Sequence, residues 1–241
     1  MKLYRTFNEN LLNLDSSYIE VKGAEFLHLS KSLRIKVDDE VEVFDGKGSS
    51  CKAIVKELHK SYLILYLSSV INTETNKSSI ISIIPFIKKE NLNFLSHKLT
   101  ELGVDEIHLY KPDLLDQSLQ KKDLNKIMDK IDAILINACK QCERNFKPKI
   151  FMHNNLSTAL KINEDRTLIA FNFSGKTNLN TDMKDIKIGI ITGPESGFSE
   201  NEEIAIKNQS SETYLLGDFP LKAETAAIVA VSLIQHQKGL L

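Results

Sequence analysis

The 241-residue sequence contains no tryptophan, only five prolines and only three cysteines. Three cysteines without dense spacing exclude the disulfide framework of a small secreted domain. No apolar run is long enough to cross a bilayer, and the N-terminus lacks the basic flank and cleavage site of a signal peptide. The sequence therefore predicts a cytoplasmic protein with no membrane segment.

An excess of charge of one sign is also missing, because the formal net charge is −1. Such a chain has no overall field that attracts nucleic acid, so any RNA contact must come from local basic clusters. Cys139 and Cys142 stand in a helical pattern with no second Cys or His pair at metal-ligand spacing. The sequence therefore predicts no metal site.

The N-terminal part of the chain has the pattern of a small β domain. β-branched residues recur near period two in short segments, which is typical of half-buried strands. Asp45-Gly46-Lys47-Gly48 supplies the turn residues of a hairpin between the first two segments. The expected strands are residues 39–44, 50–55 and 62–67.

A polar segment without periodicity follows this β domain at residues 72–79 (NTETNKSS). Such a composition is typical of a linker between two cores. The sequence thus predicts a β domain over residues 1–71, the linker, and a second domain over residues 80–241.

The second domain alternates strands with helices. Its first strand is a continuous apolar run, as expected for a strand buried on both faces, and the next segment places leucines at helical spacing before Gly103. This alternation predicts a parallel sheet with right-handed crossovers. The expected strands are residues 80–86, 104–109, 167–173, 187–192 and 213–216, and the expected helices are residues 88–102, 122–144 and 224–235.

Two turns rich in glycine follow the last two expected strands. Residues 193–198 (GPESGF) lead into Ser199 and Glu202, which have the spacing of a capping box at the start of a helix. The second turn contains Gly217. The helix that follows it, residues 224–235, is apolar or small on nearly every face and must be buried in this chain or against a second copy.

Two C-terminal segments stand in the order of a known paired signature: residues 193–202 (GPESGFSENE) and residues 215–227 (LLGDFPLKAETAA). They resemble the signature of the SPOUT superfamily of RNA methyltransferases, and most closely its 16S rRNA uridine N3-methyltransferase family. The hairpin at residues 40–48 (EVEVFDGKG) and residues 101–104 (ELGV) resemble further segments of that family.

This resemblance implies a fold class and a chemistry. The fold would be α/β, with a C-terminal SPOUT domain that has a parallel sheet and a deep trefoil knot, preceded by a small PUA-like β-barrel domain that binds RNA. The cofactor would be S-adenosyl-L-methionine, held in the knot of an obligate homodimer. The expected reaction is methylation of N3 of a uridine in the 16S rRNA of the small ribosomal subunit.

The two turns are the predicted cofactor site. Irregular backbone after a strand offers unpaired N–H and C=O groups to an adenine edge, and glycines let that backbone approach closely. The alternative is that the glycines only turn the chain. The predicted cofactor-binding residues are Gly193, Glu195, Gly197, Leu216, Gly217 and Leu221.

Methyl transfer to N3 also requires the imide proton to leave. Glu195 or Glu224 is the candidate base, and Lys222 is the candidate for stabilising negative charge on the uracil oxygens. Alternatively, Glu224 only places negative charge at the start of the final helix.

Two basic clusters are candidates for RNA contact, although charge runs are often only solvated faces. The first consists of Arg5, Lys31, Arg34 and Lys36 in the β domain, and the second of Lys140 and Arg144 with Lys147 and Lys149.

Three residues depart from the family pattern. Ser196 stands where a second glycine is usual, and Phe219 and Lys222 stand where arginines are usual. Lysine keeps the charge of arginine but loses its bidentate geometry. These departures leave two alternatives open: a SPOUT methyltransferase with another RNA target, or an RNA-binding protein of ribosome assembly without catalysis.

Overall fold

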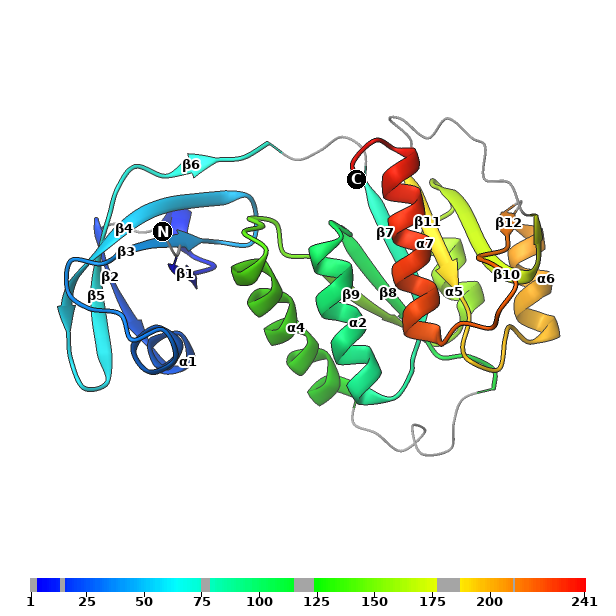
Figure 1. Cartoon of the computed structure of the whole chain (residues 1–241), viewed down its shortest axis with the longest axis horizontal. Coiled ribbons are helices and arrows are strands. Elements are labelled where there is room, and N and C mark those ends of the chain that lie inside the picture. The colour runs from blue at the N-terminus through cyan, green and yellow to red at the C-terminus, as the bar shows by residue number, and fades with distance from the viewer. Residues whose placement is uncertain (1–3, 14–15, 75–78, 115–123, 177–186, 210) are drawn as a thin grey trace. The chain divides into compact units, whose positions relative to one another are not determined.

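The computed structural model describes residues 4–13, 16–74, 79–114, 124–176, 187–209 and 211–241. The chain forms two compact units, Met1–Thr75 with Ile136–Lys147, and Asn76–Leu135 with Pro148–Leu241 (Figure 1). Residues Ile136–Lys147 therefore pack with the first unit, although the sequence placed them in the second domain. The expected linker lies partly outside the described residues.

The first unit is built on a mixed six-stranded sheet. The strand order is β1-β3-β4-β5-β2, with β6 paired to β4, and only the β1–β3 pair is parallel. The predicted hairpin joins β3 to β4, and its Gly46 and Gly48 both have positive φ. The elements are β1 (Tyr4–Phe7), β2 (Tyr18–Lys22), α1 (Gly23–Leu27), β3 (Glu40–Phe44), β4 (Ser49–Leu58), β5 (Tyr62–Leu67) and β6 (Ile71–Asn72), with a 3₁₀ turn at Leu11–Asn13 and a π-helical turn at His28–Ser32.

Arg5 explains why Ile136–Lys147 belongs to the first unit. Its guanidinium donates to the Glu42 carboxylate at 2.7 Å and to the Cys139 carbonyl at 2.6 Å, and it also bonds the Asn145 side chain. Arg5 is 2% exposed. Since a buried charge must be paired, this residue fixes the end of the long helix to the β domain.

The second unit is the predicted parallel α/β domain. Its six strands follow the order β12-β10-β11-β7-β8-β9, and every pair is parallel. The strands are β7 (Ile80–Pro85), β8 (Glu106–Tyr110), β9 (Lys149–His153), β10 (Thr167–Lys176), β11 (Ile188–Thr192) and β12 (Glu212–Tyr214). The helices are α2 (Lys89–Glu101), α4 (Leu124–Gln141), α5 (Leu156–Ile162), α6 (Glu200–Asn208) and α7 (Ala223–Gln237).

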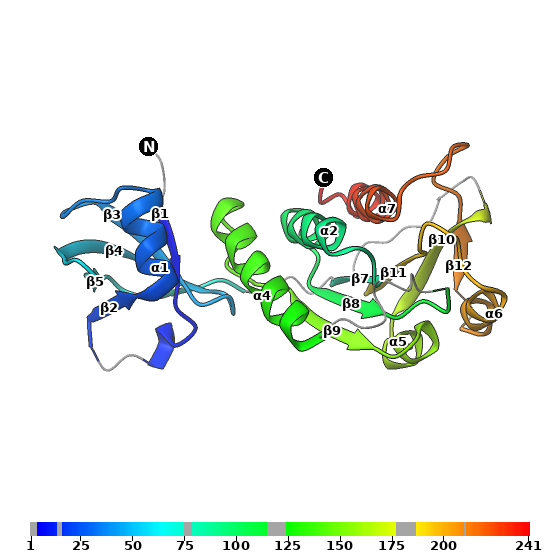
Figure 2. The same ribbon diagram turned by 90° about the horizontal axis from the view of Figure 1, so that it is seen from below.

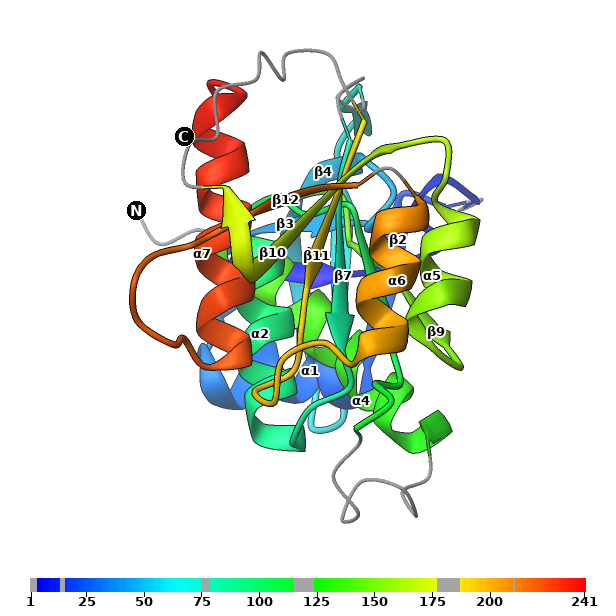
Figure 3. The ribbon, with the colours of Figure 1, turned by 90° about the vertical axis from the view of Figure 1, so that its right-hand side faces the viewer.

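Helices cover both faces of this sheet (Figures 2 and 3). Apolar side chains of α2, α4 and α7 share one core with the sheet, and those of α5 and α6 share the core on the other face. Every residue of β7 is buried, as its continuous apolar run predicts, and every residue of β11 is buried as well. Among the described helices, none is both long and apolar enough to cross a membrane.

Two predicted helix ends, the end of α2 at Gly103 and the start of α6 at Ser199, are confirmed by the structure. Gly103 follows α2 with φ 77°, the left-handed conformation of a residue just past a helix end. Ser199 and Glu202 form both hydrogen bonds of the capping box at the start of α6. Helix α7 packs on α2, where the Gln235 amide donates to the Leu102 carbonyl at 2.6 Å. One face of α7 is therefore buried within this chain.

Candidate functional site

A cavity opens beyond the carboxyl ends of β11 and β12 and beside the middle of β10. The carboxyl ends of parallel strands meet at one edge of a sheet, which is where open α/β sheets bind their ligands. The cavity encloses about 510 Å³, including the part open to solvent. Its walls are Phe171, Asn172, Phe173, Gly193, Pro194, Gly197, Phe198, Leu215, Leu216, Gly217, Phe219, Leu221, Ala223 and Ala226.

The predicted cofactor-binding residues converge on this cavity with one exception. Glu195 does not line it, because its exposed side chain lies outside the turn. The other residues come from two turns that are distant in sequence and meet here because β12 and β11 flank β10. Those that line the cavity are Gly193, Gly197, Leu216, Gly217 and Leu221.

The glycines of the first turn serve two different purposes. Gly197 has φ 78°, and its N–H donates to the Pro194 carbonyl at 2.9 Å, so the turn needs a residue that tolerates positive φ. A Cβ on Gly193 would lie 3.3 Å from the Phe198 ring, so this position needs a small residue for space. Ser196 is not among the residues with positive φ and does not line the cavity, so its side chain neither strains nor blocks it.

The second turn presents unpaired backbone to the cavity. Leu215 donates its N–H to the Lys176 carbonyl at 2.9 Å, which fixes the start of the turn beside β10. Within the described part of the chain, the N–H groups of Leu216 and Gly217 have no hydrogen-bond partner. Gly217 has φ 151°, a conformation that side chains rarely adopt. The turn can therefore bind the polar edge of a flat ligand.

The third wall comes from the middle of β10 and was not predicted. Phe171 and Phe173 line the cavity with Asn172, whose amide also donates to Glu203 on α6 at 3.1 Å. Their place beside both turns depends on the crossover that puts β10 between β11 and β12. Phe219, which departs from the family pattern, also lines the cavity but is 82% exposed and does not fill it.

The candidate catalytic residues have different environments. Lys222 is exposed and is the N-cap residue of α7. Glu224 lies in the first turn of that helix, and its Oε2 is buried without a hydrogen-bond partner among the described residues. Glu195 is exposed. Neither Lys222 nor Glu224 lines the cavity, although both flank its wall residue Ala223 along the chain.

A buried tyrosine supports the strand that leads into the first turn. The Tyr110 hydroxyl donates to the Thr192 carbonyl at 3.2 Å, and burial raises the pKa of this phenol well above its usual value. Beyond β8, the Asp113 N–H donates to Glu202 at 3.2 Å, and the Ser199 hydroxyl donates to the Asp113 carboxylate at 2.6 Å. These bonds tie the segment after β8 to the start of α6.

The structure removes two residues from the predicted basic clusters. Arg5 is buried and uses its guanidinium on partners within the first unit. Lys140 forms an ion pair with Glu25 at 2.6 Å, and its side chain is 7% exposed. Neither presents a free charge to a phosphate, so their assignment to RNA contact is corrected to a structural role. Sequence alone could not reveal these partners, which are distant along the chain.

The remaining predicted RNA-binding residues are accessible to different degrees. Lys31, Arg34 and Lys36 are exposed, and Arg34 has φ 56°. Arg144 is half-buried, and its carbonyl accepts a hydrogen bond from Arg5 at 3.3 Å. Only the first three form an open basic segment.

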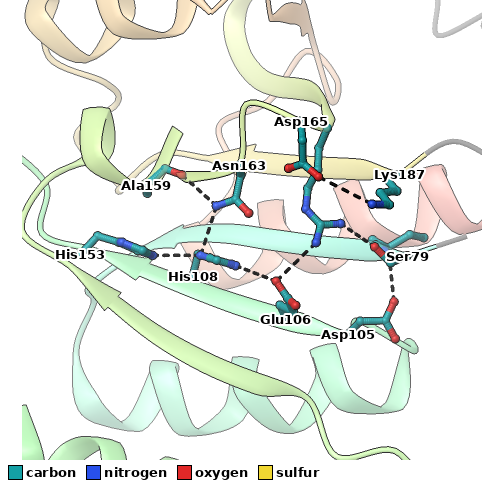
Figure 4. Close-up of polar contacts among 11 residues, drawn as sticks. Ser79, Asp105, Glu106, His108, His153, Ala159, Asn163, Asp165 and Lys187 are labelled. Carbon is teal, nitrogen blue, oxygen red and sulfur yellow. Dashed lines mark hydrogen bonds and ion pairs between the residues drawn. The ribbon is translucent and has the colours of Figure 1, made fainter. Parts of the chain in front are cut away.

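A buried histidine pair lies beneath α5, near the sheet edge that is opposite β12 (Figure 4). His108 Nδ1 is 2.9 Å from His153 Nε2 and 3.2 Å from the Asn163 amide nitrogen, and His108 Nε2 is 3.2 Å from Glu106. The amide nitrogen is a donor, so His108 Nδ1 accepts and its Nε2 donates to Glu106. Burial lowers the pKa of both histidines. Among the described residues, no cluster of His, Cys, Asp or Glu could hold a metal ion.

The fold is a parallel α/β domain with a cavity at the edge of the sheet where such domains bind their ligands. Residues 74–235 match the family described as RNA methyltransferase domain, and residues 21–65 match the RNA methyltransferase PUA domain. The chain therefore belongs to the RNA methyltransferase family and is an enzyme of that class.

Relatives of similar length support this membership. The chain is 29% identical to ribosomal RNA small subunit methyltransferase E of Helicobacter pylori, over 90% of this chain and 94% of the relative. It is 27% identical to the protein of that name from Rickettsia conorii, over 98% of this chain and 96% of the relative. A methyltransferase from Legionella pneumophila, solved with bound S-adenosylmethionine, has the same fold, with a TM-score of 0.88, 22% identity and 98% coverage of both chains.

Proposed function

We propose that this enzyme transfers the methyl group of S-adenosylmethionine to N3 of a uridine in the 16S rRNA of the small ribosomal subunit. The main support is the convergence of two distant turns on one cavity in a chain that belongs to the RNA methyltransferase family. Two relatives are named as methyltransferases of small-subunit ribosomal RNA. Because a ribosomal subunit is the proposed substrate, the enzyme would act in the cytoplasm.

The cavity suits this cofactor in its chemistry, because its walls are largely apolar side chains and irregular backbone. The unpaired N–H groups of Leu216 and Gly217 would bind the adenine edge, and the Phe171 and Phe198 rings and Leu221 would contact its apolar faces. When bound, S-adenosylmethionine supplies an electrophilic methyl group on a sulfonium ion.

The first residues of α7 are proposed to handle the substrate. The uracil nitrogen must lose its proton, and the free Oε2 of Glu224 can hold that proton. The Lys222 ammonium would stabilise the negative charge that grows on a uracil carbonyl oxygen. Glu195 is the weaker candidate for the base, because its side chain is exposed, whereas the Oε2 of Glu224 is buried without a hydrogen-bond partner among the described residues. Correct alignment of nitrogen and methyl carbon would supply much of the rate.

Phosphate contacts are assigned to the open basic segment of the first unit, Lys31, Arg34 and Lys36, with Arg144 as a further candidate. Such contacts would position the rRNA without reading its sequence. Replacing each residue by alanine should lower the salt dependence of rRNA binding. An unchanged slope would exclude that residue.

A homodimer and a trefoil knot complete the proposal. Helix α7 leaves Leu233 exposed, and Leu240 and Leu241 are exposed just beyond it, so a second copy could cover this apolar surface. The knot is proposed from the resemblance of the two C-terminal turns to the SPOUT signature. Light scattering should give the mass of a dimer, and Leu233→Asp should give that of a monomer. Tracing the chain in an experimental electron-density map would test the knot.

The activity is tested with unmodified small subunits and labelled S-adenosylmethionine, followed by mass spectrometry of the nucleosides. The expected product is 3-methyluridine in 16S rRNA. A methyl group on another atom or another RNA would favour a different target for the same fold. Cofactor binding without transfer to any ribosomal RNA would favour a protein of ribosome assembly that lacks catalysis.

A further inference from the structure

One face of the sheet in the first unit exposes tyrosine rings that do not contribute to its core. Tyr18 on β2 and Tyr66 on β5 are cross-strand partners, and their ring centroids are 5.0 Å apart. They remain 54% and 41% exposed, whereas the neighbouring Ile19 and Leu65 point into the core. Large aromatic side chains usually contribute by burial, so this exposed pair indicates a contact surface.

A second aromatic site lies on the same face. The Tyr62 ring stacks on His59, with centroids 4.3 Å apart and an interplanar angle of 19°. Tyr62 precedes Tyr66 by four residues on β5, which corresponds to about 13 Å at the rise of a strand. Ile64 lies between them on the same face and is half-buried. The two ring sites are therefore joined by an apolar surface along one strand.

Each ring site has a lysine beside it. The Lys22 ammonium is 5.9 Å from the Tyr62 ring centroid, and the Lys56 ammonium is 6.0 Å from that of Tyr66. We call these six residues the aromatic face: Tyr18, Tyr62, Tyr66, His59, Lys22 and Lys56. Aromatic planes with adjacent cations are the combination that binds unpaired bases together with their phosphates.

The charge of this surface is mixed, and its unpaired cations lie on β4. Glu20, opposite Ile64 on the same face, pairs with Lys22 at 2.5 Å, so a phosphate there would have to replace the carboxylate. Glu57 lies 2.7 Å from the His59 ring. By contrast, Lys52 and Lys56 form no ion pair within the described ranges. Glu40, opposite Ile54 on β3, is exposed and would repel a phosphate there. The favourable region is therefore β5 and the adjoining part of β4.

We propose that the aromatic face binds single-stranded RNA, with unpaired bases stacked at the two ring sites and phosphates beside Lys22 and Lys56. The inference deepens the proposed function, on which it rests, by naming a stacking surface separate from the basic segment of Lys31, Arg34 and Lys36. A duplex keeps its base faces within the helix and cannot stack on these rings. The bound RNA is therefore an unpaired segment of the substrate.

The test is fluorescence anisotropy of the full-length protein with a labelled single-stranded RNA of about 12 nucleotides. The double variant Tyr18→Ala/Tyr66→Ala should bind roughly tenfold more weakly or worse, because stacking one base on a ring contributes about that factor. The matched variant Tyr18→Phe/Tyr66→Phe keeps both rings and should bind within about twofold of the parent. Tyr18→Leu/Tyr66→Leu keeps apolar area without rings and should bind as weakly as the alanine variant.

Several results would overturn the inference. The alanine variant would bind the single-stranded RNA as tightly as the parent, or the leucine variant would do so. Alternatively, the parent would bind the duplex form of the same RNA as tightly as the single strand. Removing Lys22 or Lys56 should lower the salt slope of binding by up to about 0.7 for each lost phosphate contact. An unchanged slope would remove the lysines from the site.

A separate measurement distinguishes this inference from the proposed function. In methyl transfer to small subunits, the alanine variant should have a raised KM for RNA and a kcat close to that of the parent. If the parent itself transfers no methyl group, the proposed function fails, yet the anisotropy series still decides whether the aromatic face binds RNA. If the alanine variant keeps the KM of the parent while the parent is active, only the aromatic face is refuted.

Discussion

Gly197 offers a matched test of the cofactor turn. It has φ 78°, and a Cβ added there would meet no atom within 4 Å. Gly239, beyond the last helix and outside the cavity, has φ 69° and equally open surroundings. Alanine at either position therefore costs only backbone strain, which is about 1–2 kcal/mol in the left-handed region. The two substitutions should have similar effects on stability.

Their effects on cofactor affinity should differ. In Gly197→Ala the turn can relieve strain only by changing the conformation that the Gly197–Pro194 hydrogen bond maintains at 2.9 Å. If bound S-adenosylmethionine requires that conformation, its affinity should fall by up to the strain energy, which corresponds to about 5- to 30-fold. Gly239→Ala should leave the affinity unchanged.

Titration calorimetry with S-adenosylmethionine measures this difference, and thermal unfolding followed by circular dichroism measures stability. Circular dichroism is suitable because the protein has no tryptophan to report unfolding by fluorescence. The reasoning is refuted if Gly197→Ala binds the cofactor as tightly as Gly239→Ala while both are folded. An equal loss of affinity in both variants would refute it as well.

Three further predictions concern other parts of the molecule. Arg5→Ala should lower the free energy of unfolding, measured by urea titration, by about 3–5 kcal/mol, because it leaves the buried partners of the guanidinium unpaired. The control variant Lys31→Ala removes an exposed side chain and should stay within about 0.5 kcal/mol of the parent. Equal free energies of unfolding for the two variants would show that Arg5 contributes no more to stability than a surface residue. Lys222→Ala should lower kcat by about 10²–10³-fold and leave cofactor affinity nearly unchanged, and equal losses in both would remove its catalytic role. Burial lowers the pKa of His108 and His153, so below about pH 6.5 the unfolded chain binds protons that the folded chain does not. The free energy of unfolding should therefore be highest above about pH 6.5 and should fall as the pH drops below it. An unchanged free energy of unfolding between about pH 7.5 and 5.5 would contradict this prediction.

Much of the fold follows from local patterns. The continuous apolar run of β7 and the capping box of α6 predicted their elements because each signal depends on neighbouring residues. Strand β9 and the short helix α5 were missed. Strand β9 is a partly exposed edge strand, and α5 has only seven residues, so neither has a strong periodic pattern.

The candidate site was predictable only where the motif is contiguous. Gly193 and Gly217 belong to turns that are visible in sequence, and both line the cavity. Phe171 was missed because its neighbours are set by the strand order, which places β10 between β11 and β12. Arg5 and Lys140 were misassigned because charge in a sequence does not reveal a buried partner. Both kinds of error, the missed wall residue and the misassigned basic residues, thus arise from contacts between residues that are distant in sequence.

The central claim is that the turns at residues 193–198 and 215–221 together bind the methyl donor. Hydrogen–deuterium exchange with and without S-adenosylmethionine tests it directly, because the amides of Leu216 and Gly217 have no partner among the described residues. Added cofactor should slow exchange in peptides that cover both turns. Unchanged exchange in either turn at saturating cofactor, or protection confined to another region such as the groove between α5 and α6, would contradict the account.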